Sequence, residues 1–144
     1  MKIVSITITL LLLLIANNAF AECWIASGFK GYGSNAADKF NIHEDGLSNK
    51  KIHISINGNK SSVTGSEEIS FKEVTPQLIV GVYMSGSYKG VVESWGIDIE
   101  NRKVFYTQTK SGYTIFDGAK MFIGDLEQDW GHILISELKN EYND

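Results

Sequence analysis

The side chains best suited to nucleophilic chemistry are one cysteine and three histidines. Cys23 is the only cysteine in the 144 residues, and the histidines are His43, His53 and His132. A thiol becomes a catalytic nucleophile when an imidazole lies beside it in space. The spacing of these residues gives no reason to expect such a contact, and His53 falls on the polar side of an alternating segment. An enzyme that uses Cys23 is therefore the least favoured hypothesis.

Other catalytic and ligand-binding patterns are missing from the sequence. It contains no G-x-S-x-G, H-E-x-x-H or phosphate-binding glycine loop. The carboxylate pairs Glu44-Asp45 and Glu67-Glu68 stand near turns, where such side chains are usually solvated. The cysteine and the histidines lack the spacing of a metal-ligand set. We therefore expect no catalytic residues, no metal and no cofactor.

Aromatic residues give a stronger signal, and they indicate binding. They make up 11% of the chain, and most have the spacing of core residues. Tyr88 and Tyr113 instead fall in glycine-flanked turns, and Tyr32 stands between Gly31 and Gly33. Exposed aromatic side chains of this kind can anchor a protein interface. Tyr32, Tyr88 and Tyr113 are therefore the candidate interface residues.

Residues 1–21 have the pattern of a secretory signal peptide. Lys2 supplies a positive charge, residues 3–16 are mostly apolar, and Ala19-Phe20-Ala21 fits an A-x-A cleavage site. The apolar run is shorter than the roughly 20 residues that a membrane-spanning helix needs. We expect cleavage before Glu22, no stable membrane span afterwards, and export to the bacterial periplasm or the cell exterior.

A single cysteine in an exported chain can be in one of three chemical states. It can be lipidated, form a disulfide with another chain, or remain a free thiol. Bacterial lipidation needs a small residue directly before the cysteine, and Glu22 occupies that position. Cys23 therefore remains a candidate intermolecular thiol, with an idle thiol as the alternative.

Charge and length restrict the class of protein further. The chain carries 13 basic and 17 acidic residues, a formal net charge of −4. An acidic protein with scattered basic residues does not fit nucleic-acid binding. Residues 22–144 have the length of one domain, and no Pro-rich or Ser-rich linker divides them. We expect a single β-rich domain over 22–144.

Alternation of apolar and polar residues predicts strands along most of this domain. Ile52, Ile54 and Ile56 alternate with polar residues, and Asn57-Gly58 then predicts a hairpin turn. The segment 78–84 is apolar on both faces and is predicted to be the central strand. Further strands are predicted at 60–64, 91–99, 103–109, 113–116 and 120–123.

Roughly seven to nine short strands joined by tight turns indicate an antiparallel meander. A closed barrel or a two-layer sandwich would hide both the apolar face and the edges of such a sheet. The fold class is therefore mainly β: a small barrel, or a strongly curved sheet or sandwich. The spacing of apolar residues within 125–142 favours a C-terminal helix with Asp129 as its candidate N-cap, and the alternative is a short strand over 132–136.

These observations favour a small exported, non-catalytic binding protein that contacts another protein, as inhibitors and immunity proteins do. The net negative charge would suit a basic partner. The alternative is a β-barrel carrier of a small apolar ligand, with an interior lined by Leu78, Val80, Val82 and Trp95.

Overall fold

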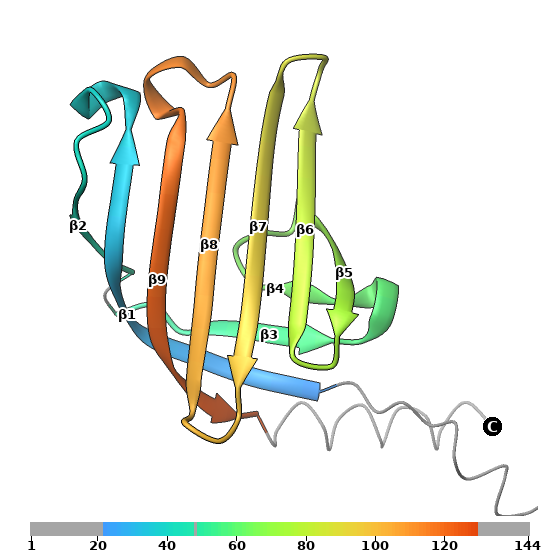
Figure 1. Cartoon of the computed structure of the whole chain (residues 1–144). Helices are drawn as coiled ribbons and strands as arrows, with labels where there is room; N and C mark the ends of the chain where they lie inside the picture. The colour runs from blue at the N-terminus through green and yellow to red at the C-terminus, as the bar shows by residue number, and fades with distance from the viewer. Residues whose placement is uncertain (1–21, 48, 130–144) are drawn as a thin grey trace, which may run out of the picture.

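The computed structural model describes residues 22–47 and 49–129, which form one antiparallel sheet that is nearly closed into a barrel (Figure 1). The predicted fold class is confirmed. The strands are β1 (Glu22–Asn35), β2 (His43–Asp45), β3 (Ile52–Ile56), β4 (Ser62–Val63), β5 (Ser70–Thr75), β6 (Leu78–Ser85), β7 (Lys89–Asp98), β8 (Lys103–Ser111) and β9 (Gly118–Gln128). Three short 3-10 helices connect them: η1 (Ala36–Asp38), η2 (Gly58–Lys60) and η3 (Thr114–Phe116).

The strand order leaves one seam unpaired. The strands run β4-β3-β1-β9-β8-β7-β6-β5, and β2 adds to β1 beside this path. β4 and β5 therefore end the sheet on the two sides of the seam. The backbone N–H of Gly58, in η2, crosses the gap and donates a 2.8 Å hydrogen bond to Oε2 of Glu73 on β5. This contact brings the two ends of the sheet together without strand pairing.

The sheet curves because β1 bends. Residues 22–26 pair with β3, whereas the pairing with β9 extends to Asn35. Between Ser27 and Lys30 the register with β9 shifts by one residue, and Gly28 has φ +64°. A bulge of this kind bends its strand and increases the local twist. In Figure 1, β3 and β4 consequently cross behind the taller strands β6 to β9.

Alternate residues of the strands fill the space between these two parts of the sheet. The buried cluster contains large apolar side chains from both parts, among them Trp24, Phe29, Ile54, Phe71, Trp95 and Phe122. Ring contacts join its centre, with 4.3 Å between the ring centroids of Trp95 and Tyr106 and 6.0 Å between those of Phe29 and Trp95. Such burial is the main favourable term in the stability of a domain without a disulfide.

Two predictions about individual segments are wrong. The segment predicted as the central strand is β6, which lies next to the terminal strand β5. Residues 114–116 form η3 instead of a strand, and β9 is one long strand over Gly118–Gln128. The Asn57-Gly58 hairpin exists, but its turn is η2, and Asn57 keeps a negative φ of −155°.

Within the segment 125–142, where a C-terminal helix is expected, residues 125–128 belong to β9, and the helix that would follow the expected N-cap Asp129 lies outside the described residues. Pairing with Lys103 of β8 and Ser27 of β1 holds this end of β9 extended. The remaining residues of that prediction, including His132, and the predicted signal peptide at 1–21 lie outside the described residues. Within the described ranges, no helix has both the length and the apolar character needed to cross a membrane.

The bulge in β1 gives a direct test of the bend. We expect Gly28→Ala to lower the free energy of unfolding by about 1–2 kcal/mol, because an L-residue is strained in the left-handed region. Its Cβ would also lie 3.1 Å from Oδ2 of Asp125. Gly28→Asn should cost less, since asparagine tolerates this conformation better. Urea unfolding measures both values, and an alanine variant as stable as the wild type would contradict the strained bulge.

Candidate functional site

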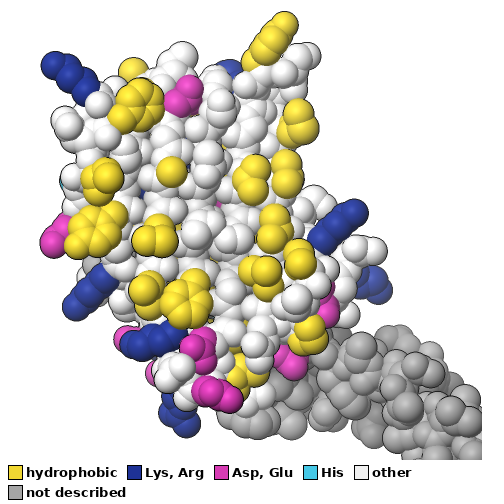
Figure 2. All heavy atoms as spheres, viewed as in Figure 1, with side chains coloured by type: hydrophobic (Ala, Val, Ile, Leu, Met, Phe, Trp, Pro, Cys, Tyr) yellow, Lys and Arg dark blue, Asp and Glu magenta, His cyan; other side chains and the backbone are white. Residues whose placement is uncertain are grey.

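The outer side of the tall strands carries an exposed apolar surface, which we call the outer apolar face. Its residues are Tyr32, Val80, Val82, Val92, Phe105, Met121 and Ile123. They come from β1, β6, β7, β8 and β9, and neighbouring strands place them opposite one another, as in the pairs Tyr32–Met121 and Phe105–Ile123. Figure 2 shows these yellow side chains spread across the face.

The centre of the outer apolar face is uncharged. The outward positions between its apolar residues carry small polar side chains, and the hydroxyls of Ser94 and Thr107 lie 2.6 Å apart. Charged groups stand at the margins, such as the ion pair of Lys103 and Asp125 at 2.6 Å. Figure 2 shows this blue and magenta border below the apolar area. An exposed apolar patch with a polar rim is typical of a surface that binds another molecule.

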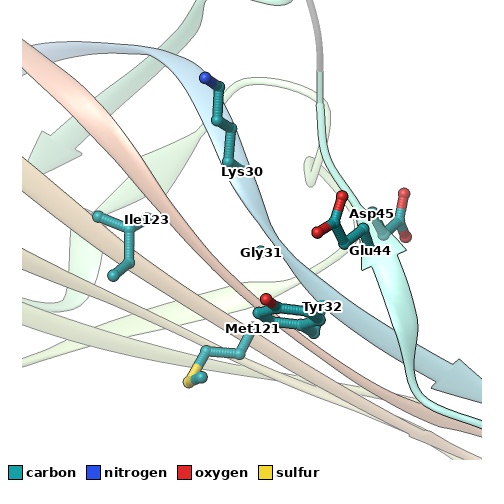
Figure 3. A pocket seen from close by; sticks show the side chains of 7 residues that line it. All are labelled: Lys30, Gly31, Tyr32, Glu44, Asp45, Met121 and Ile123. Atoms are coloured by element: carbon teal, nitrogen blue, oxygen red, sulfur yellow. The ribbon is translucent and has the colours of Figure 1, made fainter.

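A hollow of about 370 Å³ lies at one edge of this face. Tyr32, Met121 and Ile123 provide apolar side chains, and β2 adds Glu44 and Asp45 (Figure 3). Register places Glu44 directly opposite Tyr32, on the same side of the sheet. The hollow thus combines an apolar floor with the exposed carboxylate of Glu44, and Lys30 lines it as well.

The second carboxylate of the hollow is already engaged. Asp45 lies 2.7 Å from Nζ of Lys120 and accepts a 2.8 Å hydrogen bond from the backbone N–H of Gly46. The hydrogen bond from Lys120 is the largest cause that lowers the pKa of Asp45. Glu44 is therefore the carboxylate of the hollow that is better placed for a ligand.

A second pocket opens on the inner side of the sheet, and we call it the polar cup. It has a volume of about 460 Å³. Its walls come from the segment between β4 and β5 and from β6, β7 and β8, with Glu67, Glu68, Tyr83, Glu93, Lys110 and Tyr113 among them. The polar cup differs from the outer apolar face in lying on the inward side of the strands and in carrying charge.

Glu93 is the most unusual residue of the polar cup, because its carboxyl group is 3% exposed. Oε1 accepts hydrogen bonds from Tyr106 at 3.1 Å and Gln108 at 2.6 Å. Oε2 accepts them from Ser66 at 3.0 Å and Trp95 at 3.3 Å. Four donors offset the desolvation that makes a buried carboxylate costly.

These contacts make Glu93 a structural centre. Burial, and then the negative charge of Glu93, raise the pKa of Tyr106, so its hydroxyl remains protonated and donates. Ser66 belongs to the segment that crosses from β4 to β5, while the other donors belong to β7 and β8. The carboxylate therefore fastens the seam segment to the tall strands. With both oxygens occupied, it is poorly placed to act as a general base.

A third pocket, of about 220 Å³, gathers Cys23, His53 and Asp129. Nδ1 of His53 lies 2.9 Å from Oδ2 of Asp129, and the Asp129 backbone N–H donates to the Cys23 carbonyl at 3.0 Å. Sγ of Cys23 lies 4.0 Å from Oγ of Ser55. Pairing of β1 with β3 brings His53 to Cys23, and pairing of β1 with β9 brings Asp129; the separation along the sequence did not predict this grouping.

The electrostatics of this pocket do not favour a catalytic thiolate. Burial is the largest effect and raises the pKa of Cys23; the hydrogen bond with the Ser55 hydroxyl offsets part of this rise, and the carboxylate of Asp129 adds a smaller increase. Catalytic cysteines have the reverse property, a lowered pKa that supplies thiolate near neutral pH. Cys23, His53 and Asp129 are therefore the residue types of a cysteine-based catalytic site, but the thiol lacks the lowered pKa that such a site needs.

The three candidate tyrosines lie in different places. Tyr32 is 52% exposed and belongs to the outer apolar face, whereas Tyr113 lines the polar cup. Tyr88 is 89% exposed in the turn between β6 and β7, outside both. The structure brings Tyr88 near Tyr113, since a Cβ on Gly112 would meet the Tyr88 carbonyl.

Sequence reasoning missed Glu93 and most of the outer apolar face. Glu93 stands at an inward position between Val91 and Trp95, so the alternation itself marked it as a buried carboxylate. Phe105 and Ile123 are outward positions of strands that have polar or small neighbours. The sequence pattern that could have identified them is an apolar residue at a strand position that alternates with the core residues.

Within residues 22–47 and 49–129, no group of three or more Cys, His, Asp or Glu side chains is arranged to hold a metal ion. Comparisons of the chain with family models, with curated proteins and with solved structures gave no match. The function must therefore be argued from the surfaces themselves.

Removal of the Glu93 carboxylate should destabilise the whole domain. We expect Glu93→Ala to lower the free energy of unfolding by about 3 kcal/mol or more, because several buried donors lose their acceptor together. Glu73→Ala is the control, since its carboxylate accepts an exposed hydrogen bond from Gly58 and should cost about 1 kcal/mol. Equal losses in the two variants, measured by urea unfolding, would contradict the structural role of Glu93.

Alkylation by iodoacetamide tests the state of Cys23. Since the pKa of Cys23 is raised in the folded protein, its thiolate should appear at higher pH than in the urea-unfolded chain, whose thiol has a pKa of about 8.5. The rate should therefore be slower in the folded protein at any pH below that value. If the alkylation rate of the folded protein rose with pH at a lower midpoint than that of the unfolded chain, Cys23 would be an activated nucleophile, and the enzyme hypothesis would be supported.

Proposed function

We propose that this chain is an exported, non-catalytic binding protein that engages another protein through its outer apolar face. The observation that carries the proposal is the uncharged centre of this face. Phe105, Ile123 and Val92 leave apolar area in water although the opposite side of the same strands has a filled core. Covering such area with an apolar protein surface contributes roughly 25 cal/mol per Å².

The hollow beside Tyr32 supports a partner that presents a basic side chain. Its apolar floor suits the aliphatic part of a lysine or arginine side chain, and Glu44 suits the charged end. A partner with apolar residues around one basic side chain would therefore complement this edge of the face. The net negative charge of the chain would also speed association with a basic protein.

The inner side of the sheet gives less support to a carrier of apolar ligands. Of the four residues expected to line its interior, Val80 and Val82 point outward and only Trp95 belongs to the buried cluster. The inner pocket described above has polar walls. The sequence of residues 1–21 supports action after export, in the periplasm or outside the cell.

Charge placed on the outer apolar face should abolish the interaction. We expect Phe105→Lys and Ile123→Lys each to weaken partner binding at least tenfold, about 1.4 kcal/mol, because an unpaired ammonium would be buried. Ile42→Lys is the control, an apolar residue that is more exposed than either, directly precedes β2 and is not among the residues of the outer apolar face. Glu44→Gln should weaken binding less, and more at low salt than at high salt.

The measurement begins with capture from the exported fraction by the wild type and the three lysine variants. A protein lost with both face variants and retained with the control is then purified and titrated. Saturable binding of a basic protein with this pattern is the expected result. Equal binding by all variants, absence of a saturable protein partner, or a second copy of this chain as the only partner would contradict the proposal.

A further inference from the structure

We propose that the polar cup binds an organic cation, an ammonium or guanidinium group on an alkyl chain. This site lies on the inward side of the sheet and does not depend on the outer apolar face. The same chemistry can come from a lysine or arginine side chain of another protein or from a free polyamine.

The charges around the polar cup favour a positive group. Three carboxylates, of Glu67, Glu68 and Glu93, face one ammonium group, of Lys110. Glu67 is fixed in place, because its Oε1 accepts a 2.7 Å hydrogen bond from the backbone N–H of Gly65. A concave surface lined by an excess of one charge concentrates ions of the opposite charge.

Two aromatic rings give an independent indication of the same class of ligand. Tyr83 and Tyr113 both line the polar cup, and the face of a tyrosine ring attracts cations. Tyr113 already does so within the chain, since Nζ of Lys89 lies 5.7 Å from its ring centroid. The turn holds this ring in place through a 2.5 Å hydrogen bond from the Tyr113 N–H to Oδ1 of Asp117.

Glu93 contributes its charge to the site, but no direct hydrogen bond. Its two oxygens are occupied by four donors, so a ligand meets a fixed negative charge at the buried end of the polar cup. Val91 and Ile69 add apolar wall beside it, which suits an alkyl chain. The volume of about 460 Å³ lies in the range of small-molecule sites.

The test is a titration of the purified protein, followed by NMR of the tyrosine and backbone signals. N-acetylarginine amide represents a protein side chain, spermidine represents a free polyamine, and N-acetylglutamine amide is the neutral control. We expect saturable shifts at Tyr83 and Tyr113 with at least one of the two cations and none with the neutral compound. Tighter binding of N-acetylarginine amide would indicate a protein side chain as the natural ligand, and tighter binding of spermidine would indicate a free polyamine.

Matched variants assign the binding to the polar cup. Tyr113→Leu and Glu68→Gln should each weaken the better cation at least threefold. Tyr88→Leu and Glu100→Gln should leave it unchanged, because these exposed turn residues lie outside the polar cup. Phe105→Lys should also leave the affinity for the cation unchanged, because Phe105 lies on the outer apolar face. A negative result in this titration therefore leaves the protein-binding proposal untouched.

Three results would overturn this inference. The first is the absence of saturable shifts with both cations. The second is equal binding of the neutral amide, which would remove the role of charge. The third is equal weakening by the Tyr88 and Tyr113 variants, which would place the binding outside the polar cup.

Discussion

The bend of β1 at Gly28 divides the strand into two parts: β9 pairs with both parts, whereas β3 pairs only with residues 22–26, before the bend. The rest of the architecture depends on this bend, because it folds β3 and β4 over one side of the tall strands. That side becomes the core around Trp95 and Phe122. The other side has no covering layer among the described residues, which is why apolar residues such as Phe105 remain exposed there.

The short strands β3 and β4 cover only part of the inner side, and this explains the polar cup. Where they cover it, large apolar residues pack; further along the same strands, Glu93, Gln108 and Lys110 take the inward positions. The buried carboxylate of Glu93 joins these two regions through its bonds to Trp95 and Ser66. One network therefore stabilises the seam and sets the charge of the inner pocket.

Much of the fold follows from local patterns in the sequence. Alternation identified β3, β7 and β8, and the turn residues between them indicated an antiparallel sheet that curves on itself. The position of β6 could not be predicted, because an apolar segment such as 78–84 can be central or can form part of an exposed face. Gly28 permits a bend in β1, but the exchange of β3 for β2 along the edge opposite β9 depends on pairing between strands, which no local pattern reveals.

The candidate sites were less accessible to sequence reasoning. Tyr32 and Tyr113 were identified because glycine neighbours mark irregular or exposed positions, yet they belong to two different surfaces. The grouping of Cys23 with His53 and Asp129 arises from the pairing of β1 with β3 on one edge and with β9 on the other, which no spacing along the chain reveals. Phe105 and Ile123 were assigned no role, although each stands on the side of its strand opposite to the core residues.

The central claim is that the outer apolar face contacts another protein, and photo-cross-linking tests it most directly. A photoreactive amino acid is placed at Phe105 or, as a control, at Ile42, in the full chain expressed in cells. The account predicts one discrete adduct with a different, basic protein from position 105 and none from position 42. No adduct from position 105, or the same adducts from both positions, would contradict it.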